Sequence, residues 1–284
     1  MTTVDSTLAL FRKSVLKQAK FRQISSMMED PTNRSNLDLG GDNGVLSFLL
    51  RQKGGTWSSG DLDEKTVGSI RDLVGDRVYR LDGSTLPFPD DSLDQIVVID
   101  YLEHVHEDKE AVLEFQRVLK PGGILVVNVP RPKPGSMLTR IRHALGLTDA
   151  WHGHVRPGYS EEELKSLLAP AFELENVRTY SRSFSEAIDT GLNGAFERLK
   201  GRQGSSSRKG TVITGYEMQS HRRAFRLMSL LHPILWAVSK LDWLLVGQTG
   251  YKMVARARLT GKPSANSGKY HRMQQVRDIA AALK

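Results

Sequence analysis

The chain of 284 residues contains no cysteine, so disulfide bonds and thiolate metal sites are excluded. This absence fits a reducing compartment. Long apolar runs are also lacking. Residues 1–30 mix basic residues with single apolar ones, and we expect no secretory signal there. The most apolar segment, residues 222–246, is interrupted by His232, Pro233 and Lys240. Its uninterrupted apolar stretches, such as residues 234–238, fall well short of the ~18 residues that a membrane-spanning helix needs.

Basic residues are only in modest excess over acidic residues. The chain has 40 Lys and Arg against 32 Asp and Glu, a formal net charge of +8. The basic residues are dispersed and no DNA- or RNA-binding motif accompanies them, so we expect no nucleic-acid partner. The excess fits either a solvated basic surface or contact with an anionic membrane or an acidic substrate. The hydrophobic content of 39% is that of ordinary globular proteins and allows one large domain or a domain with a cap.

Strand and helix patterns alternate over the first half of the chain. Strand patterns lie at residues 36–39, 56–60, 78–81, 95–99 and 124–129. Helical patterns lie between them at 45–52, 64–74 and 109–119. This alternation predicts a doubly wound α/β fold with a parallel sheet, in which ligands bind beyond the carboxyl ends of the strands. Residues 6–29 also have helical spacing, and they could pack over the sheet or serve as a flap over a ligand site.

A glycine-rich turn follows the first predicted strand. Gly40, Gly41 and Gly44 allow a close approach of the backbone to a ligand, and the helix after them would point its N-terminus at an anionic group. Asp38 and Asp42 add carboxylates, which suit a ligand that also carries an ammonium group. The spacing does not fit the G-x-G-x-x-G turn of dinucleotide-binding proteins. It therefore disfavours a nicotinamide-dependent oxidoreductase.

Acidic residues follow the next two strands. Asp61 lies about 20 positions beyond the glycine turn, where a carboxylate can accept hydrogen bonds from a ribose diol. Asp63 could take the same role or cap the following helix. Asp82 and Gly83 follow the third strand, and from these two residues alone a simple turn is an equal alternative.

Two longer segments carry a family resemblance. Residues 86–108 read LPFPDDSLDQIVVIDYLEHVHED, and residues 114–130 read EFQRVLKPGGILVVNVP. Together with the glycine turn they resemble, in order and spacing, the motifs of the class I S-adenosylmethionine-dependent methyltransferases, of the type 11-like small-molecule group. Asp42 stands where that family has a glycine, and Leu93 stands where it has an aromatic residue.

The resemblance implies a fold and a cofactor. The fold would be a Rossmann-like, seven-stranded, mostly parallel sheet, completed by strands near residues 172–180 and 250–259. The cofactor would be S-adenosyl-L-methionine, with Asp61 facing its ribose and Asp82 its adenine. The cofactor-binding residues implied in this way are Asp38, Gly40, Gly41, Gly44, Asp61, Leu62, Asp82, Gly83, Asp100 and Tyr101.

The same resemblance places catalytic and acceptor-binding residues at the sheet edge. His104 follows the fourth strand, and His154 lies in a loop beyond the fifth, so both are candidate general bases. His152, Arg156 and Tyr159 are the candidate substrate-binding residues, and Arg156 could bind an anionic acceptor with two hydrogen bonds. The alternative is that these residues only stabilise a loop. We predict no metal site, because two histidines at i and i+2 without further ligands fall short of one.

A long insertion separates the last two strands. The sixth strand is expected to run parallel to the first five, so the insertion begins at the ligand-binding edge and could form a lid or a substrate channel. Residues 222–246 could form a helical pair packed on the core or a helix lying at a membrane interface. The expected organisation is a helical segment at 1–30, a core at 31–180, a lid or substrate insert at 181–249, the last strand at 250–260 and a basic tail at 261–284.

The predicted function is S-adenosylmethionine-dependent methylation of a small-molecule, saccharide or lipid-linked acceptor. The alternative is a regulatory protein that binds S-adenosylmethionine without turnover. We expect a cytoplasmic protein that could be peripheral to the inner face of the membrane. The acceptor atom and the oligomeric state do not follow from the sequence.

Overall fold

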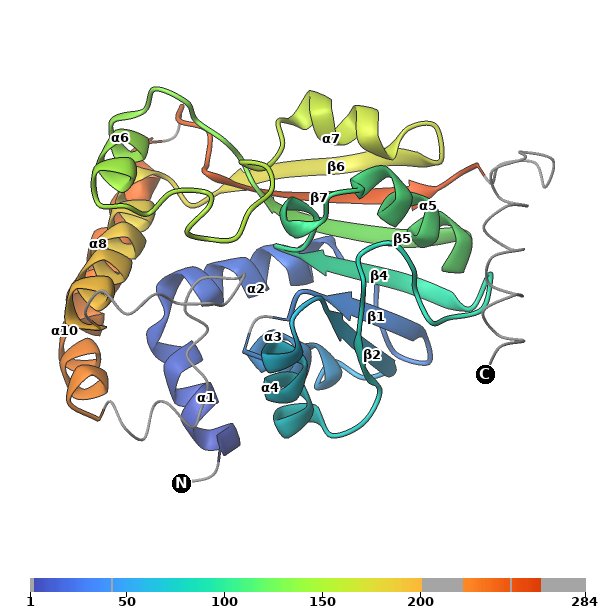
Figure 1. Ribbon diagram of the computed structural model, residues 1–284, viewed down its shortest axis with the longest axis horizontal. Helices are drawn as coiled ribbons and strands as arrows, with labels where there is room; N and C mark the ends of the chain where they lie inside the picture. Colours follow the sequence, from blue (N-terminus) through green and yellow to red (C-terminus); the bar gives the residue numbers. More distant parts are fainter. Residues whose placement is uncertain (1–2, 42, 201–221, 246, 262–284) are drawn as a thin grey trace.

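The computed structural model describes residues 3–41, 43–200, 222–245 and 247–261. The predicted basic tail therefore lies almost entirely outside the described residues, as do Asp42 and the middle of the insertion. Figure 1 shows one layer of strands with helices on both faces and a group of helices beyond one end of the sheet.

The sheet has seven strands in the order β3-β2-β1-β4-β5-β7-β6. All neighbouring strands pair in parallel except at β7, which is antiparallel to both β5 and β6. The predicted doubly wound, mostly parallel sheet is thus confirmed. The strands are β1 (Ser35–Leu39), β2 (Thr56–Asp61), β3 (Val78–Arg80), β4 (Leu93–Ile99), β5 (Leu119–Pro130), β6 (Phe172–Tyr180) and β7 (Lys252–Leu259).

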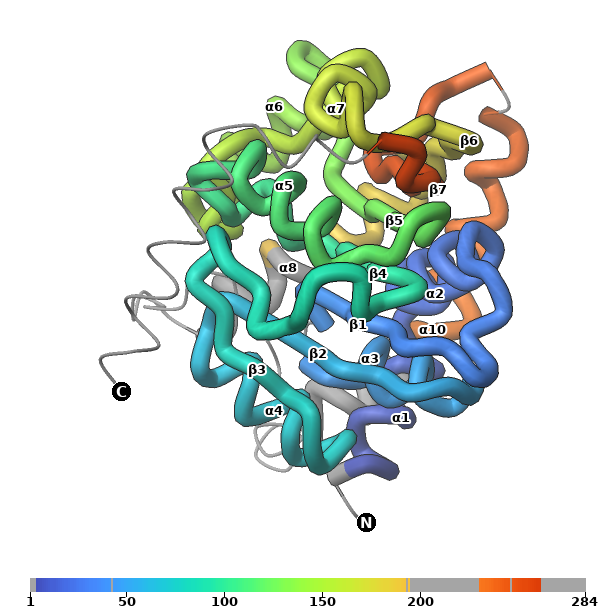
Figure 2. The backbone as a smooth tube through the Cα atoms, turned by 90° about the vertical axis from the view of Figure 1, so that its right-hand side faces the viewer, coloured from blue at the N-terminus to red at the C-terminus, as the bar shows by residue number. Residues whose placement is uncertain are grey.

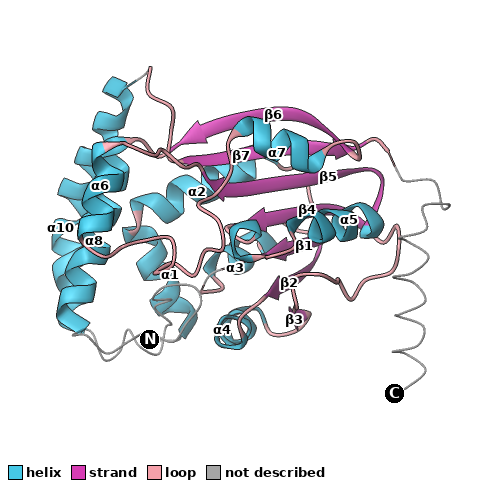
Figure 3. Ribbon diagram, turned by 45° about the horizontal axis from the view of Figure 1, so that its top comes forward, coloured by secondary structure: helices cyan, strands magenta, loops and turns pink. Residues whose placement is uncertain are grey.

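Each face of the sheet is covered by helices (Figure 3), and this burial explains why the strands are apolar throughout. In β4, Ile96 and Val98 belong to the core cluster that includes Phe115 of α5, whereas Val97 and Ile99 belong to the opposite cluster. The helices of the core are α3 (Val45–Arg51), α4 (Glu64–Val74), the 3₁₀ turn η1 (Leu102–His104), α5 (Asp108–Val118), α6 (Met137–Ala144) and α7 (Glu161–Leu168).

The N-terminal segment forms two helices where the sequence pattern predicted one. They are α1 (Thr3–Lys13) and α2 (Val15–Met27), and the chain breaks at Ser14, whose hydroxyl accepts a hydrogen bond from the Lys17 amide at 3.3 Å. A serine side chain that caps the second helix in this way explains the break. Ile24 and Met27 of α2 are buried in the core cluster that also contains Val97, so α2 packs on the sheet. Figure 2 shows α1 and α2 on the same side of the sheet as α10.

The insertion between β6 and β7 is helical where it is described. Its elements are α8 (Ser183–Lys200), α10 (Arg222–Lys240) and the 3₁₀ turn η2 (Leu241–Leu245). Because β6 is parallel to β1–β5, the insertion leaves the sheet at the carboxyl edge, where Figure 1 shows α8 and α10 beside α6. Asp242 ties it down, since its carboxylate accepts hydrogen bonds from the amides of Arg182 at 2.8 Å and Phe184 at 2.9 Å. Among the described residues, no helix is long and apolar enough to cross a bilayer.

A buried arginine fixes the loop between β3 and β4. Arg117 is 5% exposed, forms a bidentate pair with Glu114 at 2.8 and 2.9 Å, and also binds Asp90 at 2.7 Å. It further donates hydrogen bonds to the carbonyls of Phe88 at 2.8 Å and Leu86 at 3.0 Å. One planar guanidinium therefore holds the loop that leads into β4.

Replacing Arg117 by lysine should destabilise the fold, because a single ammonium cannot satisfy five acceptors in this plane. Loss of the buried network should lower the free energy of unfolding by about 3 kcal/mol. The matched control is Arg80→Lys, whose exposed ion pair with Glu64 spans 3.6 Å and whose effect should stay within about 0.5 kcal/mol. Urea unfolding measures both. Equal effects of the two substitutions would contradict the structural role of Arg117.

Candidate active site

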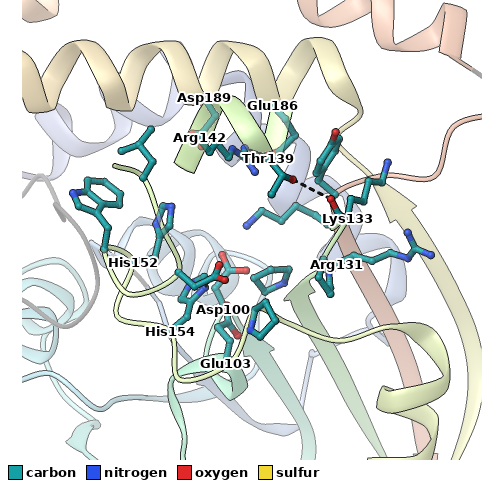
Figure 4. Close-up of a pocket in the computed structure, with 18 of the residues that line it drawn as sticks. Asp100, Glu103, Arg131, Lys133, Thr139, Arg142, His152, His154, Glu186 and Asp189 are labelled. Carbon is teal, nitrogen blue, oxygen red and sulfur yellow. Dashed lines mark hydrogen bonds and ion pairs between the residues drawn. The ribbon is translucent and has the colours of Figure 1, made fainter. Parts of the chain in front are cut away.

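A cavity of about 600 Å³ lies at the carboxyl edge of the sheet. Its floor comes from Gly40 after β1 and from Asp100 and Glu103 after β4, and its walls come from the 130–157 loop, α6 and α8. Figure 4 shows Asp100, Glu103 and His154 on one side of this cavity, and Arg142 beside Glu186 and Asp189 on the opposite side. Arg131 and Lys133 lie on a third side. Parallel sheets bind their ligands at this edge, so the cavity is the candidate active site.

The glycine turn is fixed against the end of β4. Gly40 has φ +83°, and a Cβ placed there would lie 2.0 Å from the Ile99 carbonyl oxygen. Gly44 has φ +84° and precedes α3, and a Cβ there would lie 2.8 Å from the Ile70 Cα. Only glycine tolerates both the positive φ and the lack of space for a Cβ at these positions, so the turn brings bare backbone to the cavity. Asp42, the residue that departs from the family pattern, lies outside the described residues.

Asp38 supports the turn from within the core. Its carboxylate is fully buried and accepts hydrogen bonds from the hydroxyls of Ser47 in α3 at 2.5 Å and Ser59 in β2 at 2.8 Å. Burial raises the pKa of Asp38 to about 6, although the two serine hydroxyls oppose the shift. Asp38 does not line the cavity. Asp38 therefore supports the turn from within the core, and its predicted contact with a cofactor stays a prediction.

The acidic residues after β2 and β3 are already engaged with their own turns. Asp61 is fully buried and accepts a hydrogen bond from the Asp63 amide at 3.1 Å. Asp63 caps α4 by accepting from the Thr66 amide at 3.0 Å, so the structure favours capping for Asp63. Asp82 accepts from the amides of Ser84 and Thr85, each at 2.8 Å. Burial raises the pKa of Asp82, but these hydrogen bonds outweigh it and hold the pKa below its usual value.

The remaining predicted cofactor residues lie around these turns. Asp61, Leu62, Asp82 and Gly83 surround the ends of β2 and β3, and a Cβ on Gly83 would lie 3.4 Å from Leu62. Tyr101 is 2% exposed, and burial raises the pKa of its hydroxyl. Gly41 packs so closely that a Cβ would lie 2.2 Å from Ser47 Oγ. None of these residues lines the cavity, so their contact with the adenosine half of a nucleoside ligand stays a prediction.

Asp100 connects the sheet to the N-terminal helices. It has φ +43°, forms an ion pair with Lys20 of α2 and accepts a hydrogen bond from Asn128 Nδ2 at 2.9 Å. Burial alone would raise the pKa of Asp100, but Lys20 and Lys252 lower it below its usual range. Lys20 thus belongs to the cavity. Sequence reasoning missed it, because 80 positions separate the two partners and one lysine in a basic helix carries no distinguishing signal.

Three histidines gather on one side of the cavity. The ring of His154 lies 4.9 Å from that of His104 and 5.2 Å from that of His152, measured between centroids. Burial, followed by neighbouring positive charge, lowers the pKa of His152 to about 4 and that of His154 to about 3. Both are neutral at pH 7. The structure therefore brings together the two predicted catalytic histidines and one predicted substrate-binding histidine.

Arg156 and Tyr159 do not line the cavity. Arg156 forms an ion pair with Asp108 and donates to the carbonyls of Val105 and His106, both at 2.8 Å. The Tyr159 hydroxyl donates to Asp108 at 2.9 Å. Both side chains therefore hold the loop against α5, and this geometry disfavours the predicted bidentate contact of Arg156 with an anionic acceptor. Five other basic residues line the cavity instead: Lys20, Arg131, Lys133, Arg142 and Lys252.

Comparison with known proteins explains this architecture. Residues 37–127 match the family model described as a methyltransferase domain. Over this segment the chain is similar to methyltransferase domains. The same architecture occurs in an S-adenosylmethionine-dependent methyltransferase from Mesorhizobium loti, with 16% identity, a TM-score of 0.54 and coverage of 84% of this chain and 97% of that one. It also occurs in the [4+2]-cyclase SpnF, with 20% identity, a TM-score of 0.56 and coverage of 87% and 82%.

Curated relatives match the methyltransferase domain more closely in sequence. A demethylmenaquinone methyltransferase of Clavibacter sepedonicus is 37% identical over 95 residues, which are 32% of this chain and 39% of the relative. A ubiquinone/menaquinone biosynthesis C-methyltransferase of Cellvibrio japonicus is 35% identical over 108 residues, which are 34% of this chain and 43% of the relative. The chain thus spans about two fifths of these relatives' lengths.

The cofactor that this domain implies is S-adenosylmethionine, and the residues present fit it. Gly40 lines the cavity with bare backbone, where any Cβ would collide with β4. Carboxylates at the ends of β2 and β3, from Asp61 and Asp82, can accept hydrogen bonds from a ribose and an adenine amino group. The site therefore offers backbone and acceptor groups of the kinds that such a nucleoside needs.

Replacing Asp38 by asparagine should change how stability depends on pH. The folded-state pKa of about 6 lies above the unfolded value of about 3.9, because the fold favours the protonated carboxyl of Asp38. The stability that the protonated carboxyl contributes is therefore fully present below about pH 4 and is lost as the pH rises through about 6. Relative to the wild type, Asp38→Asn should therefore gain about 2 kcal/mol of unfolding free energy between pH 4.5 and 7.5. Urea unfolding at both pH values measures this gain. Asp72→Asn on the exposed face of α4 is the control, and parallel pH profiles for the wild type and Asp38→Asn would refute the shifted pKa.

Proposed function

We propose that the protein is an S-adenosylmethionine-dependent methyltransferase. The observation that supports this most is the position of the cavity, which joins the bare backbone at Gly40 to the basic and histidine-rich wall beyond β4. When bound, the cofactor supplies a methyl group on a sulfonium, which is a good leaving group. The chain mainly has to hold an acceptor in line with that methyl group and exclude water.

Gly40, Asp61 and Asp82 would hold the cofactor, and the acceptor would occupy the part of the cavity near Asp100 and the histidines. His154 is a weak candidate for a general base, because a pKa of about 3 leaves little affinity for a proton at neutral pH. The catalytic roles predicted for His104 and His154 stay predictions. Arg142 is engaged with Glu186 across the cavity wall, which joins α6 to α8 of the insertion.

We propose a lipid-linked acceptor, because the helices beside the cavity present an apolar surface. Leu230, Ile234 and Trp236 of α10 and Trp243 and Leu244 of η2 are between 51% and 76% exposed, and we call them the apolar end surface. Large apolar side chains exposed along one helix and the turn that follows it are candidates for a binding surface.

The position of this surface connects it to the cavity. Helix α10 packs on α8, α8 also contacts α6, and both α6 and α8 line the cavity. Helix α6 adds exposed Met137 and Ile141. The amino group of Lys240 lies 4.9 Å from the centroid of the Trp236 ring, so a positive charge borders the apolar side chains. Tryptophan with flanking lysine is typical of the interface of an anionic membrane. The similarity to a demethylmenaquinone methyltransferase and to a ubiquinone/menaquinone biosynthesis C-methyltransferase supports an acceptor of lipid character.

Asp61→Ala should weaken binding of S-adenosylmethionine, because a carboxylate that accepts from the ribose contributes roughly 1.5–3 kcal/mol. Isothermal calorimetry on the wild type and the variant measures this loss, which corresponds to about tenfold or more in Kd. The control is Asp72→Asn, which should bind like the wild type. Unchanged affinity of Asp61→Ala would show that Asp61 does not contact the cofactor.

A transfer assay separates catalysis from binding alone. Methyl-labelled S-adenosylmethionine is incubated with the protein and either a total lipid extract or a mixture of soluble sugars. Label in the lipid fraction supports the proposal, and label in the sugars alone contradicts the lipid-linked acceptor. Binding in the calorimeter without label in either fraction would favour the regulatory protein.

The double substitution Leu230→Gln with Trp243→Gln should weaken association with vesicles that contain phosphatidylglycerol. Each apolar side chain contributes about 1.5–3 kcal/mol when fully removed from water, so a loss of about tenfold or more is expected. Co-sedimentation with the vesicles measures it, and Arg80→Gln on the opposite part of the core is the control. Equal sedimentation of the wild type and the double variant would exclude the apolar end surface as the membrane contact.

A further inference from the structure

Glu103, His104 and His154 form a cluster that the sequence did not reveal. Each offers a carboxylate oxygen or a ring nitrogen, and these ligand atoms lie within 4.8 Å of one another. All three residues line the cavity, and Figure 4 shows Glu103 and His154 on the same side as Asp100. The prediction of no metal site considered only the spacing of His152 and His154, which is local.

The backbone holds this cluster in a defined frame. Glu103 and His104 belong to the 3₁₀ turn η1 directly after β4. The Val155 amide donates to the Glu103 carbonyl at 2.9 Å, and the His154 amide donates to the Asp149 carbonyl at 2.9 Å. The loop that carries His152 and His154 is therefore tied to η1 by its backbone.

The hydrogen bonds of the histidines suit metal binding. Nδ1 of His104 lies 3.0 Å from the Gly153 carbonyl oxygen, which can only accept, so Nδ1 carries the proton and Nε2 presents a lone pair. Metal-binding histidines characteristically donate their second nitrogen to a backbone carbonyl in this way. Within the described part of the chain, His154 Nδ1 is buried without a hydrogen-bond partner, and the nearest carboxylate, that of Asp149, is 3.9 Å away.

We propose that Glu103, His104 and His154 bind a divalent transition-metal ion in the acceptor half of the cavity. Two imidazoles and one carboxylate form a ligand set used for zinc and for non-haem iron, and it leaves positions open for a further ligand. Calcium and magnesium prefer oxygen ligands and are disfavoured. Metal–ligand distances of about 2.0–2.2 Å in a tetrahedral site place the ligand atoms about 3.4 Å apart. The three ligand atoms, which lie within 4.8 Å of one another here, would therefore have to approach one another by at most about 1.4 Å.

Such an ion would define the acceptor more closely, and this step rests on the proposed methyltransferase function. One carboxylate leaves a divalent ion with excess positive charge, which favours an acceptor whose hydroxyl oxygen occupies an open position. The ion lowers the pKa of that hydroxyl, and the released proton passes to solvent water. His104 and His154 would then be ligands and not general bases. The expected acceptor carries a hydroxyl on or beside the atom that is methylated.

The experiment measures metal binding on the full chain without an affinity tag. Purified protein is freed of metal with a chelator and titrated with Zn²⁺ in a calorimeter, and Co²⁺ is added separately to follow its visible absorption. One equivalent should bind, with Co²⁺ bands typical of nitrogen and oxygen ligands. His154→Gln should weaken Zn²⁺ binding about 100-fold, and His106→Gln, an exposed histidine two positions from His104, should leave it unchanged.

Binding of S-adenosylmethionine, measured in parallel, shows that each variant is folded. Glu103→Gln serves as a second variant, since it keeps the shape of the side chain and removes its charge. The proposal is overturned if the wild type binds S-adenosylmethionine but no stoichiometric metal, or if His154→Gln and Glu103→Gln bind Zn²⁺ as tightly as His106→Gln. If the protein binds one equivalent of metal but transfers no methyl group, the metal site is supported and the proposed methyltransferase function is refuted.

Discussion

The close contact between the glycine turn and the end of β4 is the constraint on which the site depends. The backbone at Gly40 passes so near the Ile99 carbonyl that a Cβ would lie 2.0 Å from it. This contact fixes the turn after β1 beside Asp100, Tyr101 and η1, which all follow β4. The region expected for the cofactor and the region expected for the acceptor are therefore neighbours because two adjacent parallel strands end at the same level.

Charge in the cavity is largely compensated by pairs between distant elements. Lys20 of α2 pairs with Asp100 after β4, and Arg142 of α6 pairs with Glu186 of α8. Each pair joins a peripheral helix to another wall of the cavity, so the N-terminal helices and the insertion both depend on the charges of the site. Partly buried pairs of this kind are costly to break, because the remaining partner keeps its desolvation penalty.

The fold alone does not determine the chemistry, since a [4+2]-cyclase shares the architecture with methyltransferases. What distinguishes this chain is what surrounds the shared core. The loop that carries His152 and His154 and the apolar end surface both lie beyond residues 37–127, the segment that matches the family model. Specificity is therefore expected from residues after position 130, where the loops and helices beyond the sheet edge vary most freely.

The sequence by itself determined the sheet, its helices and the glycine turn, because periodicity, strand length and glycine act locally. The predicted helix at 64–74 and the strand at 56–60 agree with α4 and β2 to within one residue. Tertiary structure alone decided that Lys20 meets Asp100, that Arg156 turns to Asp108, and that His104 and His154 come together. These contacts join residues between 48 and 80 positions apart in the sequence, and no local pattern specifies which long side chain reaches which partner.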